Sequence, residues 1–222
     1  MFKSSEKDID LKNNKDRDRM YKLFDENQKE LFHSIKDNIF TYCCATAGSG
    51  KTLVSVASML HMLANDEINK IIYVQKVSSR FLQNGFLPGD IQEKTRMLWT
   101  PFYDAMETLG YQPEFVDRLI AFNKVSLCTD CAMRGINFDN LGIIIDEAEN
   151  CDYHTLKLIY TRCKDNCHVV SIGDNKQKDT TGKNTDFIGY NTYLANSNVG
   201  NQCNLVKNYR GKFSQLAEEY GG

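Results

Sequence analysis

The chain has 222 residues, of which 25% are charged and 41% are hydrophobic, and its formal net charge is −2. These values are typical of a globular protein and exclude a disordered or fibrous chain, and the length favours one domain rather than two. The sequence pI of about 6.1 also gives no overall basic surface of the kind that nucleic-acid-binding domains usually carry.

Residues 1–20 mix charges of both signs with almost nothing to bury, so we predict a flexible charged arm or a loose first helix there, and a folded domain over residues 21–222. Beyond this segment, apolar strand-like runs alternate with helical patterns. Strands are predicted at residues 39–45, 70–75, 125–129, 141–146 and 167–173. Strands that alternate with helices imply an α/β fold with a mainly parallel sheet and helices on both faces.

Helices are predicted at residues 51–65 and 153–163 from the spacing of their apolar residues. The region of about 77–123 adds no strand and is interpreted as a helical excursion from the sheet. Within it, residues 89–110 form a predicted helix that is entered through the turn LPGD, with Asp90 as the N-cap.

The N-terminal residues MFKSSEKDID contain no apolar core of the signal-peptide type, and no run approaches the roughly 18 apolar residues of a membrane helix. We therefore expect a cytoplasmic protein with reduced thiols. The pairs CTDC (128–131) and CKDNC (163–167) have spacings that zinc sites also use. Because both pairs adjoin apolar strand-like runs, we interpret these cysteines as small buried hydrophobes rather than as zinc ligands.

The segment ATAGSGKT, residues 45–52, matches the phosphate-binding pattern G-x-x-x-x-G-K-[ST] except that Ala45 replaces the first glycine. It follows a predicted strand and opens a predicted helix, where backbone N–H groups can hold a polyphosphate. Alanine fits the first position if its φ is negative. Lys51 is predicted to bind the β- and γ-phosphates, and the Thr52 hydroxyl to bind Mg²⁺. The predicted nucleotide-binding residues of this loop are Ala47, Gly48, Ser49, Gly50, Lys51 and Thr52.

The segment IIIDEAEN, residues 143–150, is an apolar strand that ends in two carboxylates. Asp146 is predicted to hold the Mg²⁺ ion and Glu147 to act as the general base on the attacking water, as phosphoryl transfer requires. Glu149 is interpreted as an acid favoured by a helix N-terminus. In GDNKQKD, residues 173–179, Gln177 is a candidate sensor of the γ-phosphate, and the alternative is a polar loop.

These segments together resemble the PhoH family of P-loop ATPases, which is related to the core of superfamily-one helicases. The resemblance covers most of residues 25–220. It rests on NGFLPGDIQEKTRMLWTPFYDAM (84–106), on CAMRGINFDNLGIIIDEAEN (131–150) and on GDNKQKD. It implies a single RecA-like P-loop domain that binds ATP and Mg²⁺ and hydrolyses ATP to ADP and phosphate.

The resemblance also gives roles to residues that would otherwise be interpreted as surface residues. Asn27 and Gln28 match the family's N-Q pair, where a side-chain amide is expected to read the adenine edge. Arg210 matches an arginine that can stabilise charge on the γ-phosphate. Glu149 is a departure, since the family typically has glutamine at this position.

A translocase that works by opening and closing a cleft needs two such cores, and this chain provides one. The resemblance therefore implies a homo-oligomer, in which subunits in a ring offer Arg210 to a neighbour's ATP, although the same arginine can serve its own subunit. The first predicted function is an ATPase coupled to RNA or single-stranded DNA. The alternative is an ATP-dependent switch or scaffold that turns over slowly and acts through a protein partner. A small-molecule kinase is disfavoured, because no acceptor pocket or lid is evident.

Overall fold

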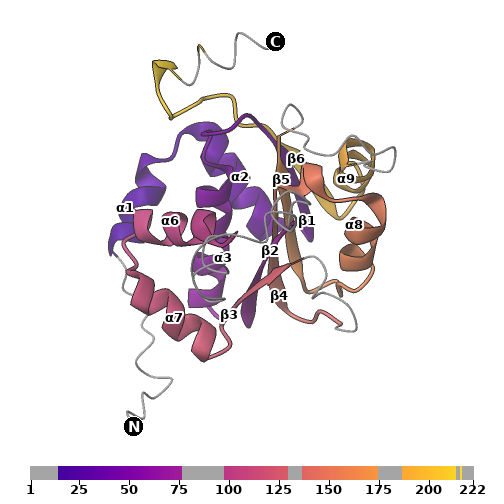
Figure 1. Ribbon diagram of the computed structural model, residues 1–222. Helices are drawn as coiled ribbons and strands as arrows, with labels where there is room; N and C mark the ends of the chain where they lie inside the picture. The colour runs from indigo at the N-terminus through magenta and orange to yellow at the C-terminus, as the bar shows by residue number, and fades with distance from the viewer. Residues whose placement is uncertain (1–14, 77–97, 130–136, 175–186, 214–215, 217–222) are drawn as a thin grey trace, which may run out of the picture.

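The computed structural model describes residues 15–76, 98–129, 137–174, 187–213 and 216 (Figure 1). Its centre is a six-stranded sheet in the order β3-β2-β4-β5-β1-β6, in which every neighbouring pair is parallel. The strands are β1 (Phe40–Cys44), β2 (Lys70–Gln75), β3 (Val125–Thr129), β4 (Leu141–Asp146), β5 (His168–Gly173) and β6 (Gly200–Cys203). Parallel neighbours need long crossover connections, so helices must cover both faces of the sheet.

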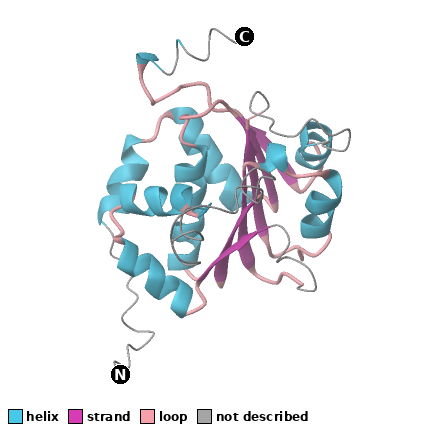
Figure 2. Ribbon diagram, viewed as in Figure 1, coloured by secondary structure: helices cyan, strands magenta, loops and turns pink. Residues whose placement is uncertain are grey.

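Figures 1 and 2 show these helices in two layers. One face of the sheet is covered by α1 (Lys15–Leu23), α2 (Glu26–Asp37), α3 (Lys51–Ala64), α6 (Thr100–Thr108) and α7 (Pro113–Ala121). The other face is covered by α8 (Tyr153–Tyr160) and α9 (Phe187–Ala195), and the short 3-10 helix η3 (Ala148–Asn150) follows β4. The α/β architecture with a parallel sheet, predicted from the alternating pattern, is confirmed.

The two faces of the sheet carry separate hydrophobic cores, and successive residues of one strand enter different cores. In β4, Ile144 packs with residues of α3 and α6, whereas Ile143 and Ile145 pack with residues of α8 and α9. All three side chains are fully buried. This double burial explains why the strand is a continuous apolar run rather than an alternating one.

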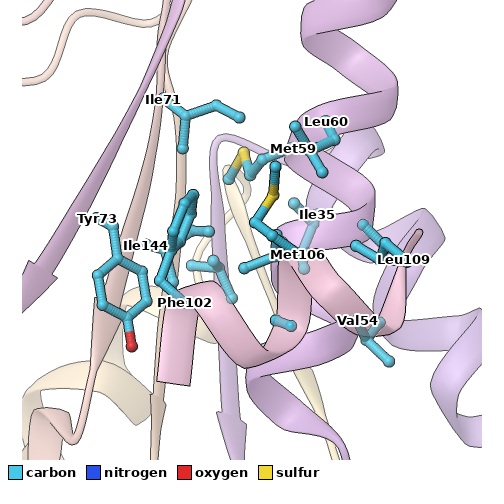
Figure 3. Packing of buried hydrophobic residues seen from close by; sticks show 14 of the residues in the cluster. Ile35, Val54, Met59, Leu60, Ile71, Tyr73, Phe102, Met106, Leu109 and Ile144 are labelled. Carbon is cyan, nitrogen blue, oxygen red and sulfur yellow. The ribbon is translucent and has the colours of Figure 1, made fainter. Parts of the chain in front are cut away.

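The core on the α3 side extends to the end of β2 and includes the described part of the helical excursion. Phe102 and Met106 of α6 lie against α3, and Phe102 also lies beside Tyr73 of β2 (Figure 3). The ring centroids of Tyr73 and Phe102 are 5.2 Å apart. The described residues of the helical excursion are therefore part of the domain core.

The five predicted strands are confirmed to within one residue at each end, and β6 was not predicted. β6 has the polar sequence GNQC, of which only Cys203 is buried. It pairs with β1 alone and packs closely under α9, where a Cβ on Gly200 would lie 2.3 Å from the carbonyl oxygen of Leu194. An edge strand needs little apolar sequence, so periodicity did not mark it.

The helix predicted at 153–163 is wrong at its C-terminal end, because α8 stops at Tyr160. The next residues pair with a loop instead: Phe138 N–H donates to the carbonyl of Arg162 at 2.9 Å, and Lys164 N–H donates to the carbonyl of Phe138 at 3.1 Å. This tertiary pairing overrides the local helical pattern.

The helix predicted at 51–65 is confirmed as α3, which is one residue shorter. Of the helix predicted at 89–110, the described part is α6, and the predicted cap at Asp90 lies outside the described residues. At the N-terminus, α1 begins at Lys15 and crosses the predicted boundary at residue 20. Among the described residues, none of the helices is long and apolar enough to cross a membrane.

Candidate nucleotide-binding site

The loop between β1 and α3 has the backbone geometry of a phosphate cradle. Gly48 and Gly50 have φ values of +76° and +89°, a region that favours glycine, whereas Ala45 is outside it. The Ala45 N–H donates to the carbonyl of Gly173 at 3.1 Å, so this residue continues the pairing of β1 with β5. The expectation that alanine fits the first position is confirmed, because the chain leaves the strand without a left-handed residue there.

The side-chain amide of Gln28 holds this loop in place. Its Nε2 donates to the carbonyl of Ser49 at 3.1 Å, and its Oε1 accepts from the N–H of Asp25 at 3.2 Å. The Asp25 carboxylate accepts from the N–H of Gln28 in return, so the two residues form the N-terminal capping box of α2. Gln28 is only 6% exposed. Its amide thus bonds both the loop and the helix cap, and the contact of the N-Q pair with adenine stays a prediction. The side chain of neighbouring Asn27 donates to the carbonyl of Asn204 at 3.1 Å.

Asp174 holds the loop from the other side. It follows β5, which lies between β1 and β4 in the sheet. Its Oδ2 accepts from the N–H of Ala47 at 3.2 Å, and the side chain is buried. Sequence reasoning did not select Asp174, although it belongs to the GDNKQKD segment that was singled out.

The Lys51 ammonium points back to the backbone at the start of the phosphate loop. It donates to the carbonyls of Ala45 at 2.5 Å and Thr46 at 2.9 Å. Both partners are neutral, and among the described residues no carboxylate forms an ion pair with Lys51, which suits a binding site for an anion.

Asp146, the last residue of β4, lies opposite the loop and is 5% exposed. Its Oδ2 accepts from Thr52 Oγ1 at 2.8 Å and from the Tyr73 hydroxyl at 2.6 Å, and its Oδ1 accepts from the N–H of Glu147 at 2.8 Å. Burial, together with the charge of Asp146, raises the pKa of Tyr73 well above its ordinary value, so the phenol stays a donor. A hydroxyl beside a carboxylate is a donor set that suits Mg²⁺.

Glu147 has a left-handed backbone with φ +50°, which is uncommon for a residue with a side chain. Its side chain is exposed and lines the cleft described below. Unusual backbone of this kind persists where the surrounding structure holds it, and the hydrogen bond from the Glu147 N–H to Asp146 contributes to that.

Glu149 lies in the first turn of η3, in keeping with its interpretation as an acid at a helix N-terminus, but its side chain is buried. It is 3% exposed, and its Oε2 is buried without a hydrogen-bond partner among the described residues. Burial raises the pKa of Glu149 to about 7, and the charges of Glu147 and Asp146 act in the same direction. The carboxyl fits only because residue 173 is glycine, since a Cβ there would lie 2.3 Å from Glu149 Oε2.

Arg210 reaches the same loop from the C-terminal segment of its own chain. The N–H of Tyr209 donates to the carbonyl of Gly48 at 2.9 Å, and the Tyr209 hydroxyl donates to Asp25 Oδ2 at 2.6 Å. A Cβ on Gly48 would lie 2.5 Å from Arg210 Cγ, so glycine at this position admits the arginine. We call residues 204–210, which run from the end of β6 to this contact, the C-terminal strap.

These groups surround one cleft of about 270 Å³ at the carboxyl edge of the sheet. Its principal lining residues are Ala47, Gly48, Gly50, Lys51 and Thr52 of the loop, Asp146, Glu147 and Glu149, Asp174, Pro101 and Arg210. Ser49 is 1% exposed and does not line the cleft. Gln177 lies outside the described residues. The glycine cradle, the ammonium and the hydroxyl–carboxylate pair together fit a nucleoside triphosphate with Mg²⁺.

The cysteines of the described part of the chain are free thiols. In that same part, no three His, Cys, Asp or Glu side chains gather as they would around a metal ion. Cys131 of the CTDC pair lies outside it, so zinc binding by that pair stays untested.

The family model and the curated relatives that match this chain agree on one family. A family model described as PhoH-like protein matches residues 22–207. The PhoH-like protein of Bacillus subtilis is 32% identical over 153 residues, which cover 68% of this chain and 47% of the relative. Protein PhoH of Escherichia coli K12 is 32% identical over 157 residues, which cover 69% of this chain and 44% of the relative. This chain thus spans less than half the length of these curated relatives.

Among solved structures, the large terminase from the thermophilic bacteriophage D6E matches with a TM-score of 0.50 at 16% identity. The match covers 89% of this chain and 49% of the terminase. At this identity the likeness concerns the fold alone, and it agrees with a single RecA-like domain built on a parallel sheet.

Proposed function

Because this chain belongs to the PhoH family, we propose that it is a Mg²⁺-dependent ATPase whose turnover is coupled to RNA or single-stranded DNA. The observation that carries the proposal is the single cleft in which Lys51, Thr52 and the acidic end of β4 converge. The nucleic-acid part rests on the helicase-like core that the family resemblance implies.

In this proposal each side chain has a distinct task. Lys51 exchanges its two carbonyl partners for phosphate oxygens, and Thr52 with Asp146 holds the metal ion. Mg²⁺, when bound, neutralises charge that develops on the β- and γ-phosphates. Glu147 accepts the proton of the attacking water, because its carboxylate is the exposed one at the cleft. Gln177 stays a predicted γ-phosphate sensor.

We assign Arg210 to its own subunit's site, because the strap places it over Gly48 of the same chain. An arginine in this position can stabilise negative charge in the transition state without a neighbour. ATPase specific activity measured over a wide range of protein concentration tests this: an intramolecular arginine predicts a constant value. A specific activity that falls on dilution would instead place the functional arginine in a neighbouring subunit.

The proposed coupling is tested by measuring ATP hydrolysis with and without RNA and single-stranded DNA oligonucleotides. The sample is sized by light scattering, which also tests the predicted homo-oligomer. We expect at least one nucleic acid to stimulate turnover. Lys51→Ala is the control, since it should abolish both basal and stimulated activity if one site produces them.

A failure of every nucleic acid to stimulate hydrolysis, with basal ATPase present, would overturn the coupling. It would favour the alternative of an ATP-dependent switch that acts through a protein partner. The cytoplasmic location remains part of this proposal, and fractionation of cells that express the chain checks it.

A further inference from the structure

Among the described residues, the Asp146 carboxylate has two side-chain donors, of which one belongs to the phosphate loop. Thr52 Oγ1 and the Tyr73 hydroxyl both donate to the same oxygen, Oδ2, at 2.8 Å and 2.6 Å. Thr52 is the residue proposed to bind the metal ion, so its hydroxyl serves two partners. The Tyr73 hydroxyl donates to Asp146 in the interior of the protein.

Tyr73 is well placed to hold a carboxylate in one orientation. It is fully buried in β2, two residues before the position that pairs with Asp146 across the sheet. A buried anion needs donors with fixed directions, because water is not there to replace them. A phenol on a strand gives such a donor, since packing of its ring leaves the hydroxyl little freedom.

The ring of Tyr73 is itself held by the start of α6. Its centroid lies 6.3 Å from that of Trp99, at 78° between the planes, and 5.2 Å from that of Phe102. Trp99 and Phe102 are both buried, and Figure 3 shows the rings of Phe102 and Tyr73 side by side. Pro101, between them in sequence, lines the nucleotide cleft. The first turn of α6 thus touches both the cleft and the tyrosine.

We propose that Tyr73 is a positioning residue for Asp146, whose carboxylate it keeps oriented for the metal ion. Packing against the start of α6 in turn fixes the position of the Tyr73 ring. This inference rests on the proposed Mg²⁺-ATP site. In chemical terms, the phenol O–H holds Oδ2 while the Thr52 hydroxyl is drawn to the metal, so the carboxylate does not have to reorient on binding. Through Tyr73, helix α6 of the helical excursion thereby helps to fix the orientation of the metal-binding carboxylate.

The first test is Tyr73→Phe, which keeps the ring and removes the hydroxyl. The measurement is binding of a fluorescent ATP analogue titrated with Mg²⁺, together with binding of the same analogue in EDTA. We expect the Mg²⁺ concentration for half-maximal enhancement to rise about tenfold, which corresponds to about 1.4 kcal/mol, while binding in EDTA changes less than about twofold. A general loss of structure would change both measurements.

Tyr160→Phe is the matched control. It removes a phenol hydrogen bond of the same length, 2.6 Å to Asn191 Oδ1, on the opposite face of the sheet between α8 and α9. We expect its Mg²⁺ dependence to equal that of the wild type. An equal shift in both variants would overturn the positioning role, because the effect would then follow from losing any phenol hydrogen bond.

The link to α6 is tested by Phe102→Leu, alone and combined with Tyr73→Phe. Alone it should shift the Mg²⁺ requirement about threefold, and in the Tyr73→Phe background the shift should disappear, since contacting residues are not additive. The same shift in both backgrounds would overturn the link.

The outcome for the wild type separates this inference from the function on which it rests. A wild-type chain without Mg²⁺-enhanced nucleotide binding would overturn the proposed function itself. A Mg²⁺-dependent wild type with an unchanged Tyr73→Phe variant would overturn the positioning role alone.

Discussion

The two halves of the cleft are held in different ways. The phosphate loop is fixed mainly through its backbone: Ser49 by the Gln28 amide, Ala47 by Asp174, and Gly48 by the strap. The acidic half is fixed through side chains, with Asp146 held by Thr52 and Tyr73. Glu149 in that half is buried with a raised pKa.

This difference indicates how each half responds to substitution. A backbone-held loop keeps its shape when a single lining side chain changes, so the effect should fall on nucleotide affinity. In the acidic half, the side chains are themselves the reacting or charge-bearing groups, so substitutions there should change turnover or the dependence on pH. Substitutions in each half of the cleft test that division.

The largest effect is expected at the acidic end of β4. Glu147→Gln keeps the shape of the side chain and removes the base, so ATP hydrolysis should fall by about 10²-fold or more. Single-turnover hydrolysis and ATP binding are measured on the same sample, and binding should be retained. If turnover survives unchanged, Glu147 is not the base and the assignment of the acidic half is wrong.

The next effect is a change in stability with pH at Glu149. Its folded-state pKa of about 7 is above its ordinary value of 4.5, so the folded state holds the proton more tightly. The free energy of unfolding therefore decreases as pH rises through this interval, and the full cost is present above about pH 7. In the Glu149→Gln variant this side chain is neutral at every pH, so its free energy of unfolding should not decrease in this way.

Urea unfolding at pH 4 and pH 8 measures this effect. We expect the free energies of unfolding of the variant and the wild type to agree at pH 4, below the ordinary pKa of 4.5, and the variant to be more stable by about 2 kcal/mol at pH 8, since each pKa unit corresponds to about 1.4 kcal/mol before relaxation of the charged form. Parallel stabilities at the two pH values would mean that Glu149 does not titrate in this range.

In the loop half, Gln28→Ala should weaken ATP binding about tenfold. It removes the hydrogen bonds to Ser49 and to the N-terminal cap of α2, which together stabilise the loop by about 1–2 kcal/mol. Turnover at saturating ATP should change little, and a titration of initial rate against ATP concentration separates the two effects. Asn27→Ala is the matched control, because its exposed amide contacts the strap rather than the loop.

A decrease in the maximal rate as large as the decrease in affinity would contradict the division between the halves. An equal loss of affinity in Asn27→Ala would also contradict this division, because the hydrogen bond from Gln28 to Ser49 would then have no special role.

The smallest effect is expected for Tyr209→Phe. It breaks the hydrogen bond to Asp25 but leaves the backbone contact with Gly48, and an exposed neutral-to-charged hydrogen bond contributes little in water. Nucleotide affinity should fall by about threefold or less, measured by the same titration. A loss of affinity larger than that of Gln28→Ala would show that the C-terminal strap, rather than the Gln28 side chain, holds the phosphate loop in place.

The sequence by itself determined the elements that carry long local signals. The continuous apolar run of β4, the loop from Ala45 to Thr52 and the carboxylates that end β4 are all contiguous, so periodicity and spacing were enough to find them. The family, and with it the RecA-like fold, also followed from contiguous segments.

Only the tertiary structure decided what depends on residues far apart in sequence. The Gln28 amide lies under Ser49, Tyr73 bonds Asp146 across the sheet, and Glu149 is buried against Gly173. The partners in these contacts are 21 and 73 residues apart in the first two cases. Neither a glutamine in a helix cap nor a tyrosine in a strand carries a local signal of such a partner. The reason is physical: burial and hydrogen bonding at the edge of a parallel sheet are created when separate strands are brought side by side.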